Sequence, residues 1–330
     1  MLKLLVAFLV SFFITLILGR FLVPALRRLK AGQSIKEDGP TWHMSKQGTP
    51  TMGGVMFIVG ITAALLILWR KSLLVSPAPL FVLLFALVFG AIGFVDDYAK
   101  IKKHENTGLT APQKFLLQLA AAIAFTVLLR TTGHLTPNLY FPFLEVSIPL
   151  PWPVYMVFAA FVMVGTVNAV NITDGVDGLA ASVTLPVMAF YAAVAAAWGA
   201  AFQGFGILAA AAAGGLMAFL FYNFHPARVF MGDTGSLFLG GLVCGLAFAY
   251  DMPLILILVG IIYIAETLSD ILQVAYFKAT HGKRIFRMAP LHHHFEMGGW
   301  SEVKVVAVFS FITLAACLVA FLGVAGRYSM

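Results

Sequence analysis

Ten long apolar segments divide the sequence, and their length is the feature that most limits what the chain can fold into. They fall at about 1–23, 52–69, 79–95, 114–130, 153–170, 178–198, 204–223, 236–250, 253–272 and 304–326. A helix needs about 20 residues to cross a bilayer, so ten such helices would use about two-thirds of the 330 residues. Only 11% of the residues are charged, whereas a soluble domain is about a quarter charged. The sequence therefore predicts an all-α polytopic integral membrane protein with about ten transmembrane helices.

The basic residues predict how these helices are oriented. Sixteen of the 21 lysines and arginines fall in or beside the odd-numbered connections, and cytoplasmic connections are enriched in such residues. Both termini are therefore expected outside the cytoplasm, with one transmembrane domain over 1–330. The predicted cytoplasmic loops are about 24–51, 96–113, 171–177, 224–235 and 273–303. The external segment 131–152 contains prolines and a strand-like alternation at 144–148, which predicts a small extracytoplasmic hairpin.

Charge and cysteine usage fit a membrane protein. We read the net charge of +7 as this topology together with attraction to anionic lipid head groups in the bilayer, and not as nucleic-acid binding. Cys244 and Cys317 lie in separate apolar segments, so no disulfide framework is expected. The first segment lacks a small-residue cleavage site and is read as a retained span.

Five aspartates mark the cytoplasmic ends of the apolar segments: Asp96, Asp97, Asp174, Asp177 and Asp233. The parity of the intervening segments places all five at the same face of the membrane. Anions collected at one bilayer face need a counterion, and a divalent metal bound to phosphate is the obvious one. Function is therefore expected at the cytoplasmic face.

Local patterns leave alternatives open for these acids. The adjacent Asp96 and Asp97 repel each other unless a cation is present, although nearby lysines could neutralise solvated acids. If helical turns continue through Asn171, Asp174 and Asp177, the three share one face suited to a metal or a ribose. The alternative there is an ordinary Asn/Asp/Gly turn. Asp233 stands between two glycines, where it could meet an anion or metal or simply cap a helix.

Three other segments carry polar residues. The stretch 46–54 combines a lysine, threonines and glycines, which suits anion binding or, alternatively, a capped helix start with close helix packing. The three histidines in 290–296 are poor zinc ligands because neighbouring side chains point apart, so substrate contact is favoured over a solvated loop or a surface helix. Glu266, Asp270 and Gln273 share a helical face, which favours contacts between helices.

Five of these motifs resemble those of a known family. The stretches Lys46–Gly54, Gly93–Lys100, Asn171–Ala180, Pro226–Ser236 and Ala289–Glu296 resemble, in order, the signatures of the phospho-N-acetylmuramoyl-pentapeptide-transferase family. That family is a bacterial branch of the polyprenyl-phosphate N-acetylhexosamine-1-phosphate transferases. The resemblance covers essentially the whole chain. The paired aspartates are shared by the wider group, whereas the triple histidine is more specific to the muramoyl-pentapeptide branch.

The resemblance implies a single transmembrane transferase domain and a reaction. UDP-MurNAc-pentapeptide and undecaprenyl phosphate would give lipid I and UMP with Mg²⁺, as the first membrane step of peptidoglycan synthesis. It also implies a multi-pass protein of the bacterial inner (cytoplasmic) membrane, and it is compatible with a homodimer.

The resemblance also implies which residues form the site. By motif, the catalytic residues would be Asp96, Asp97 and Asp233, with Asp97 and Asp233 as metal ligands. The substrate-binding residues would be Lys46, Thr51, Lys100, Lys103, Lys114, Asn171, Asp174, Asp177, Asn223, Phe230, Gln273, His292, His293 and His294. Where the family often has further basic residues, this chain has His104 and Thr107, so Lys103 and Lys114 match less closely.

Several alternatives to this interpretation remain at the level of sequence. For the chemistry, direct attack by the lipid phosphate is favoured over an aspartyl-phosphate intermediate, because a phosphate monoester is mostly dianionic near pH 7. Asp96 would position or deprotonate that phosphate. A related transferase could use UDP-N-acetylglucosamine, which the triple histidine argues against. An ion-coupled transporter predicts acids near the membrane midplane and an inverted repeat, and the sequence shows neither.

Overall fold

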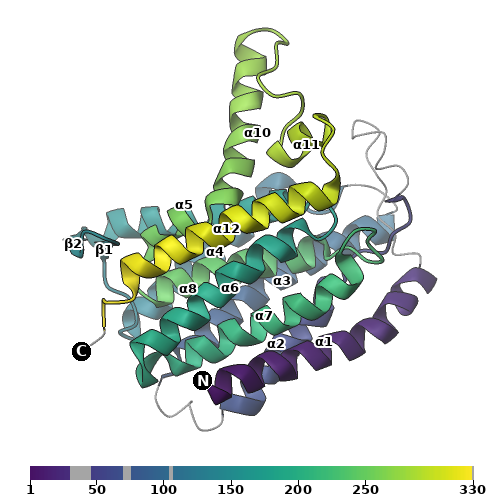
Figure 1. Ribbon diagram of the computed structural model, residues 1–330. Helices are drawn as coiled ribbons and strands as arrows, with labels where there is room; N and C mark the ends of the chain where they lie inside the picture. The colour runs from purple at the N-terminus through teal and green to yellow at the C-terminus, as the bar shows by residue number, and fades with distance from the viewer. Residues whose placement is uncertain (30–45, 70–75, 104–106, 329–330) are drawn as a thin grey trace.

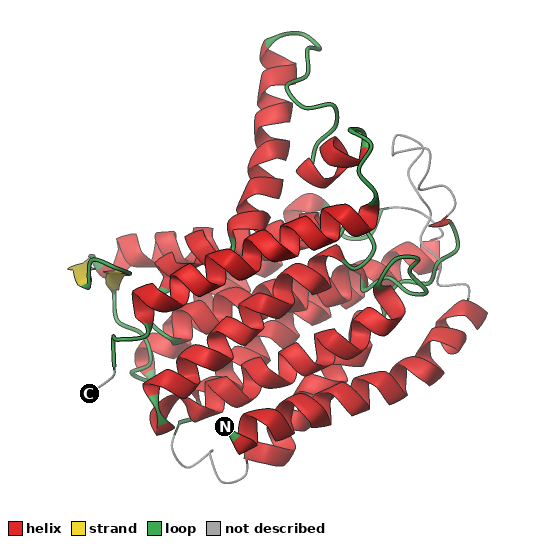
Figure 2. Cartoon of the chain, viewed as in Figure 1, coloured by secondary structure: helices red, strands yellow, loops and turns green. Residues whose placement is uncertain are grey.

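The computed structural model describes residues 1–29, 46–69, 76–103 and 107–328. Helices dominate these residues, and the only strands among them form one small hairpin (Figure 2). Four basic residues used for the orientation, Lys30, Lys36, Arg70 and Lys71, lie outside the described residues, as does His104. The helices are α1 (Leu2–Arg28), α2 (Gly54–Trp69), α3 (Ala78–Lys103), α4 (Ala111–Thr131), α5 (Trp152–Thr173), α6 (Leu179–Trp198), α7 (Gln203–Asn223), α8 (Gly232–Ala249), α9 (Leu256–Val259), α10 (Ile261–Ala279), α11 (Leu291–Glu296) and α12 (Glu302–Val324).

The prediction of a polytopic helical membrane protein is confirmed. In the described part of the chain, eight helices are long and apolar enough to cross a membrane, or nine if the bent pair α9 and α10 counts as one span. The remaining apolar segment forms α2, which has only 16 residues. Every one of the ten predicted segments therefore contains a helix, while the number of spans stays a prediction.

Several helices extend past the predicted boundaries into segments expected to be loops. The third helix continues to Lys103, so Asp96 and Asp97 lie within a helix and not in a loop that begins at 96. The eighth begins at Gly232, four residues before the predicted start at 236. The apolar runs are shorter than these helices, because the helical turns at the membrane interface contain polar and charged residues.

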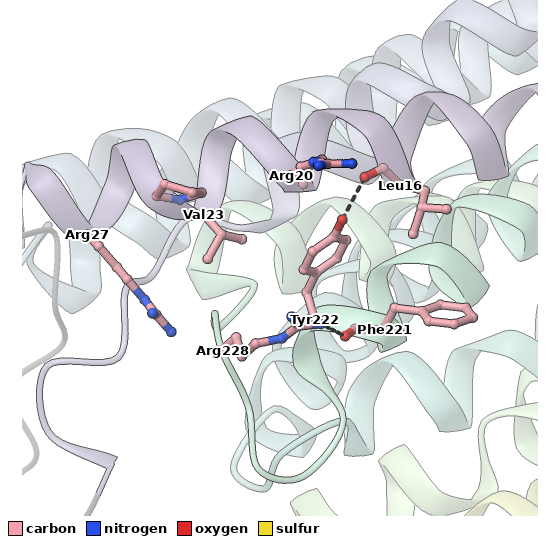
Figure 3. Close-up of a pocket in the computed structure, with 9 residues that line it drawn as sticks. Leu16, Arg20, Val23, Arg27, Phe221, Tyr222 and Arg228 are labelled. Atoms are coloured by element: carbon pink, nitrogen blue, oxygen red, sulfur yellow. Dashed lines mark hydrogen bonds between the residues drawn. The ribbon is translucent and has the colours of Figure 1, made fainter.

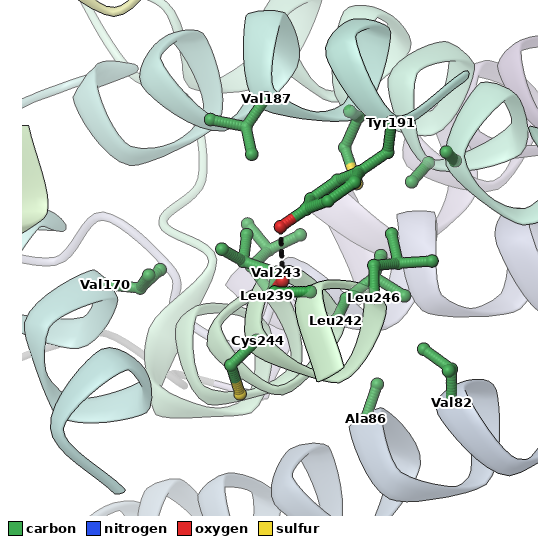
Figure 4. Packing of buried hydrophobic residues seen from close by; sticks show 14 of the residues in the cluster. Val82, Ala86, Val170, Val187, Tyr191, Leu239, Leu242, Val243, Cys244 and Leu246 are labelled. Atoms are coloured by element: carbon green, nitrogen blue, oxygen red, sulfur yellow. Dashed lines mark hydrogen bonds between the residues drawn. The ribbon is translucent and has the colours of Figure 1, made fainter. Parts of the chain in front are cut away.

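The centre of the bundle is α8, which lies along α3 and also packs against α5 (Figure 1). Its glycines make this close approach possible: a Cβ on Gly240 would meet the backbone of Val167, and one on Gly241 would meet the backbone of Ala86. Small residues at helix contacts are typical of membrane bundles. The Tyr191 hydroxyl donates a hydrogen bond of 3.1 Å to the carbonyl of Val243, which pins α6 to α8 (Figure 4).

One helix leaves the bundle. The chain bends by 81° between α9 and α10, with Gly260 at the break. As a result α10 projects away from the other helices, and the short α11 lies beside it (Figure 1).

The two strands, β1 (Asn138–Phe141) and β2 (Val146–Pro149), form an antiparallel hairpin within the segment 131–152. The hairpin and the C-terminal end of the described chain lie at one end of the bundle, and the segments that join α5 to α6 and α7 to α8 lie at the other (Figure 1). This separation agrees with the arrangement predicted from the sequence, while the orientation in a membrane stays a prediction.

Candidate active site

Three of the five aspartates form one cluster at the end of the bundle opposite the hairpin. Oxygen atoms of Asp96, Asp97 and Asp233 all lie within 4.8 Å of one another. The first two residues lie in the last two turns of α3, and Asp233 lies in the first turn of α8. Because α3 and α8 run antiparallel along each other, the end of one helix meets the start of the other.

Asp97 caps the N-terminus of α8 from the neighbouring helix. Its Oδ1 accepts the backbone N–H of Asp233 at 3.1 Å. Its Oδ2 accepts the N–H and the hydroxyl of Thr234 at 2.9 and 2.7 Å. The first N–H groups of a helix lack intrahelical partners and favour negative charge, so a buried carboxylate is well placed there. Because Asp97 satisfies these groups, Asp233 does not have to cap its own helix.

Asp233 instead faces cations. Its Oδ2 lies 2.7 Å from Lys114 Nζ and 3.0 Å from Lys100 Nζ, and its Oδ1 accepts a hydrogen bond from Asn171 Nδ2 at 2.9 Å. Lys100 also pairs with Asp96 Oδ2 at 2.6 Å. The two lysines thus bridge the ends of α3 and α4 to the start of α8.

The charges and the donor atoms of this cluster suit a divalent cation. Three carboxylates face two lysines, which leaves one negative charge uncompensated within the described residues. Carboxylate oxygens are the ligands that Mg²⁺ prefers. Asp174 lies just after α5, where burial and the negative charges of Asp233, Asp97 and Asp177 hold its pKa well above the ordinary range. A bound cation would relieve this excess of negative charge.

A second cluster forms around Asp177. Lys46 Nζ lies 2.7 Å from Asp177 Oδ1 and 2.6 Å from Glu302 Oε2. On its other side, Asp177 Oδ2 lies 3.1 Å from His225 Nδ1 and accepts the N–H of Ala227 at 2.9 Å. Three segments distant in sequence therefore meet at one carboxylate, which has a side-chain exposure of 2%, and Glu302 joins them through Lys46.

Asn171, Asp174 and Asp177 do not share one helical face. The helix α5 ends at Thr173, so the chain turns between Asn171 and Asp177. Asn171 consequently reaches Asp233, while Asp177 reaches Lys46. The turn splits the predicted row of polar residues between the two clusters.

Thr51, Asn223 and Phe230 belong to the framework that joins the first loop to the start of α8. Phe230 accepts a backbone hydrogen bond from Gly53 and donates one to Pro50, both at 2.8 Å. The amide of Asn223 donates to the carbonyl of Val229 at 2.9 Å, which shapes the segment leading to α8. Thr51 is buried, and its Oγ1 would lie 2.7 Å from a Cβ placed on Gly232. The two segments therefore form one wall beside the aspartate cluster.

The first of the three histidines is buried beside the turn after α5. His292 Nδ1 lies 3.0 Å from Glu266 Oε2 on α10, and the two side chains have exposures of 1% and 0%. The other ring nitrogen, Nε2, has no hydrogen-bond partner within the described residues and lies where a Cβ on Gly175 would be. Glu266 thus holds a ring whose free nitrogen faces the segment that carries Asp174.

The other two histidines point elsewhere, as expected for neighbours in a chain. His293 Nδ1 lies 2.8 Å from Glu296 Oε2, one turn along α11. His294 Nδ1 accepts the backbone N–H of Arg287 at 3.1 Å. The three rings therefore have three different partners and do not form a zinc site, within the described residues.

Two further predicted residues lie apart from the clusters. Gln273 is buried on α10, where its side chain binds the backbone of residues 285 and 286 at 3.0–3.1 Å and so holds the loop that precedes α11. Lys103 is exposed at the end of α3 and forms no ion pair among the described residues.

Four residues of these clusters are not predicted by the sequence motifs: Glu302, His225, Thr234 and Leu109. Leu109 donates its backbone N–H to Asp96 Oδ1 at 2.8 Å, a contact that no side-chain pattern reveals. Glu302 and His225 are single polar residues at segment ends, and only the tertiary fold brings them to Asp177. Glu266, which the sequence predicts to make contacts between helices, does make such a contact, and its partner is a histidine at the candidate site.

The sequence of the chain is similar to those of known proteins. Residues 79–251 match the model of glycosyl transferase family 4, and residues 46–58 match phospho-N-acetylmuramoyl-pentapeptide-transferase signature 1. Proteins named phospho-N-acetylmuramoyl-pentapeptide-transferase are similar along almost their whole length. The protein from Clostridium acetobutylicum is 47% identical over 95% of this chain and 96% of its own. The protein from Staphylococcus carnosus is 48% identical over 94% and 96%, and that from Caldanaerobacter subterraneus subsp. tengcongensis 46% over 97% and 98%. The chain therefore belongs to the phospho-N-acetylmuramoyl-pentapeptide-transferase family.

Proposed function

We propose that this protein transfers phospho-MurNAc-pentapeptide from UDP-MurNAc-pentapeptide to undecaprenyl phosphate, producing lipid I and UMP. The observation that carries the proposal is the cluster of Asp96, Asp97 and Asp233 with Lys100 and Lys114. This cluster lies at one end of a bundle of membrane-spanning helices. The sequence of the chain is 47% identical to that of a protein named phospho-N-acetylmuramoyl-pentapeptide-transferase. A related activity on UDP-N-acetylglucosamine and an ion-coupled transporter are not favoured, because the family match extends over almost the entire chain.

In the proposed reaction, an oxygen of the lipid phosphate attacks the β-phosphorus of the UDP-sugar. The bond from that phosphorus to the bridging oxygen breaks, and the electron pair leaves with UMP. Both reactants are anions, so most of the barrier is electrostatic. Lys100, which pairs with Asp96 and Asp233, and Lys114, which pairs with Asp233, supply positive charge at this point. Asp96 would position the attacking phosphate or accept its remaining proton.

The metal role falls to Asp97 and Asp233 in this proposal. Mg²⁺ bound there would neutralise charge on the diphosphate and on the departing UMP. Asp233 is held by Lys114 at one carboxylate oxygen and by Asn171 at the other. Asp97 is fixed by three hydrogen bonds from the start of α8, so the distance between the two helices determines the spacing of the two carboxylates.

The remaining predicted residues would bind the nucleotide, the sugar and the peptide. Lys46 and Asp177 stand with Thr51 and Phe230 near the start of α8, which suits the nucleotide side. Asn171, Asp174 and Asn223 lie around the same end of the bundle. The histidines of α11 lie beside the projecting α10, which carries Gln273, and this side of the site suits the peptide. Lys103 would act only through the general field of positive charge at this face.

We place this multi-pass protein in the bacterial cytoplasmic membrane, with the aspartate clusters on the cytoplasmic side and the hairpin outside. The separation of the hairpin from the clusters at opposite ends of the bundle supports this orientation. A homodimer stays a prediction from the resemblance.

One assay tests the proposed function. Purified full-length protein would be mixed with undecaprenyl phosphate and Mg²⁺, with either UDP-MurNAc-pentapeptide or UDP-N-acetylglucosamine, and UMP release would be measured. We expect UMP only with the muramoyl substrate, no UMP when the metal is chelated by EDTA, and recovery when Mg²⁺ is restored. UMP release with UDP-N-acetylglucosamine alone would support the related transferase activity. If neither sugar gave UMP, the proposed function would be wrong and the ion-coupled transporter would be the remaining alternative.

A second experiment distinguishes direct attack from a covalent intermediate. The enzyme would be incubated with UDP-MurNAc-pentapeptide and Mg²⁺ but without lipid. Direct attack predicts no phosphorylated aspartate in the intact protein mass and inversion at the β-phosphorus during the full reaction. A trapped phospho-enzyme, or retention of configuration, would contradict direct attack.

A further inference from the structure

A basic cavity lies between α1 and α7, outside the two clusters described above. It has a volume of about 380 Å³ and is lined by Arg20, Arg27 and Arg228, together with Tyr222 and Pro24 (Figure 3). Arg20 and Arg27 are seven residues apart and therefore lie on the same side of α1. Arg228 comes from the segment that follows α7. Three guanidinium groups from two parts of the chain thus surround one space.

Among residues 1–29, 46–69, 76–103 and 107–328, no acidic side chain pairs with the three arginines. Arg228 donates to the carbonyl of Phe221 and lies with its guanidinium carbon 5.0 Å from the ring centre of Tyr222. Uncompensated positive charge in a concave site attracts an anion, and guanidinium groups match the geometry of a phosphate.

The cavity is built on a rigid contact. The Tyr222 hydroxyl donates a hydrogen bond of 2.7 Å to the carbonyl of Leu16, which joins α7 to α1 (Figure 3). Gly19 makes the contact possible, because a Cβ at that position would lie 2.4 Å from the tyrosine ring. Pro24 has no N–H, so the carbonyl of Arg20 lacks its usual intrahelical donor and can accept from a ligand hydroxyl.

Apolar side chains next to the cavity provide a surface for acyl chains. Phe13, Ile17 and Phe21 repeat every four residues along α1 and are 53%, 57% and 69% exposed. Phe221 on α7 is 60% exposed. A cationic cavity at the end of such an apolar stripe matches the division of a lipid into head group and tails.

We propose that the cavity between α1 and α7 binds the phosphate head group of an anionic membrane phospholipid, with the acyl chains along the apolar stripe of α1. This site is separate from the proposed reaction centre, and it does not depend on the proposed function. The two are nevertheless linked through one segment: Ala227 donates its N–H to Asp177, and the next residue, Arg228, lines the cavity. A lipid bound to Arg228 would restrain the segment whose Ala227 contacts Asp177.

Lipid titration of the full-length protein in detergent tests the proposal. Delipidated protein would receive phosphatidylglycerol, phosphatidylcholine or inorganic phosphate, and we would measure the melting temperature and the bound lipid by native mass spectrometry. We expect phosphatidylglycerol to bind and to raise the melting temperature, with little effect from phosphatidylcholine or inorganic phosphate. The double variant Arg20→Gln/Arg27→Gln should bind phosphatidylglycerol about 25-fold more weakly, since each arginine contributes about fivefold near a membrane surface.

Arg28→Gln is the matched control, because Arg28 is an exposed neighbour on the same helix end that does not line the cavity. It removes the same charge and should keep the affinity within about twofold. If Arg28→Gln and the single variant Arg27→Gln lost the same affinity for phosphatidylglycerol, the lipid would be attracted by the general surface charge. That result would contradict a specific binding site in the cavity. Equal stabilisation by inorganic phosphate would overturn the lipid as the ligand. A melting temperature that follows protein concentration and not lipid would assign the face to a second copy of the chain.

Discussion

Asp96 and Asp97 have the same side chain and adjacent positions, but the structure gives them different partners. Asp96 accepts one backbone N–H and pairs with Lys100, whereas Asp97 accepts three hydrogen bonds from the start of α8. One carboxylate is therefore held mainly by a side chain that substrate could displace. The other also stabilises the contact between two helices.

Asparagine substitutions should separate the two roles. Asp96→Asn is expected to lower kcat by about 100-fold or more with little change in melting temperature. Asp97→Asn should lower kcat and also the free energy of unfolding, by about 1–3 kcal/mol, because an amide nitrogen cannot accept the N–H groups of α8. UMP release over a series of Mg²⁺ concentrations, with thermal melting, would measure both effects. Thr234→Val removes only one of the three hydrogen bonds and serves as the control. Equal melting temperatures for the two asparagine variants would contradict the assignment.

Gly175 lies so close to the buried ring of His292 that there is no room for a Cβ at this position. A Cβ at this position would lie 2.2 Å from Nε2 of His292, and that ring is fixed by Glu266. Gly175→Ala is therefore expected to displace the histidine and lower kcat/KM by about 10- to 100-fold. Gly165→Ala on α5 is a matched control, since nothing lies within 4 Å of its Cβ position. Unchanged turnover in Gly175→Ala would show that the placement of His292 does not matter to catalysis.

The raised pKa of Asp174 predicts a pH dependence of stability. Burial is the main cause, followed by the charges of three neighbouring aspartates. The neutral carboxyl is favoured in the folded state, so its contribution is complete below the unfolded pKa of about 4 and is lost as pH rises through the folded pKa. Asp174→Asn keeps a neutral side chain, and its melting temperature should exceed that of the wild type by more at pH 7 than at pH 4. A constant difference across this range would contradict the prediction.

At the scale of elements, Lys46 joins segments that the sequence does not connect. It bridges Asp177, in the turn before α6, to Glu302, the first residue of α12. Both carboxylates approach the same ammonium group, and the backbone N–H of Asp177 also donates to Glu302 at 3.2 Å. Without the lysine, two nearly buried negative charges would face each other.

This arrangement predicts that Glu302→Gln changes the melting temperature in opposite directions in the wild type and in Lys46→Met. Glu302→Gln should lower the melting temperature of the wild type but raise that of Lys46→Met, because it then removes a repulsion. We expect a coupling free energy of about 0.5–3 kcal/mol. Lys283→Met is the control, since Lys283 is exposed and pairs with no described acid, and its effect should add to that of Glu302→Gln. Additive effects of Lys46→Met and Glu302→Gln would contradict the bridge.

The elements also show what could be predicted from sequence. Apolar length located every long helix, since burial in lipid demands continuous apolar residues whatever their packing. It did not locate α11, whose six residues lie in the predicted loop 273–303. It failed at helix ends such as Asp96–Lys103, where polar residues continue the helix beyond the apolar run. The motifs located the aspartates. The pairing of Asp97 with the start of α8, and of Asp177 with Lys46, depends on antiparallel packing and a turn at Thr173, which no local pattern encodes.

At the scale of the whole molecule, the two ends of the bundle differ in chemistry. One end carries the hairpin and the C-terminal end of the described chain, and the other carries the two clusters of acids and lysines (Figure 1). A membrane protein with this polarity should present each end to a different compartment. The basic residues of the connections predict that the clusters face the cytoplasm.

Cysteine labelling should reveal this orientation directly. Cys244 and Cys317 are buried, so the natural chain should give little background with a maleimide that cannot cross membranes. Ser147→Cys on the exposed strand β2 should be labelled in intact spheroplasts, because the hairpin is expected outside the membrane. Lys283→Cys, in the exposed loop after α10, should be labelled only after the membrane is permeabilised. Labelling of both variants under denaturing conditions controls for reactivity. The opposite pattern in intact spheroplasts would place the aspartates outside the cytoplasm, where a cytoplasmic UDP-sugar could not reach them, and would overturn the proposed orientation and substrate together.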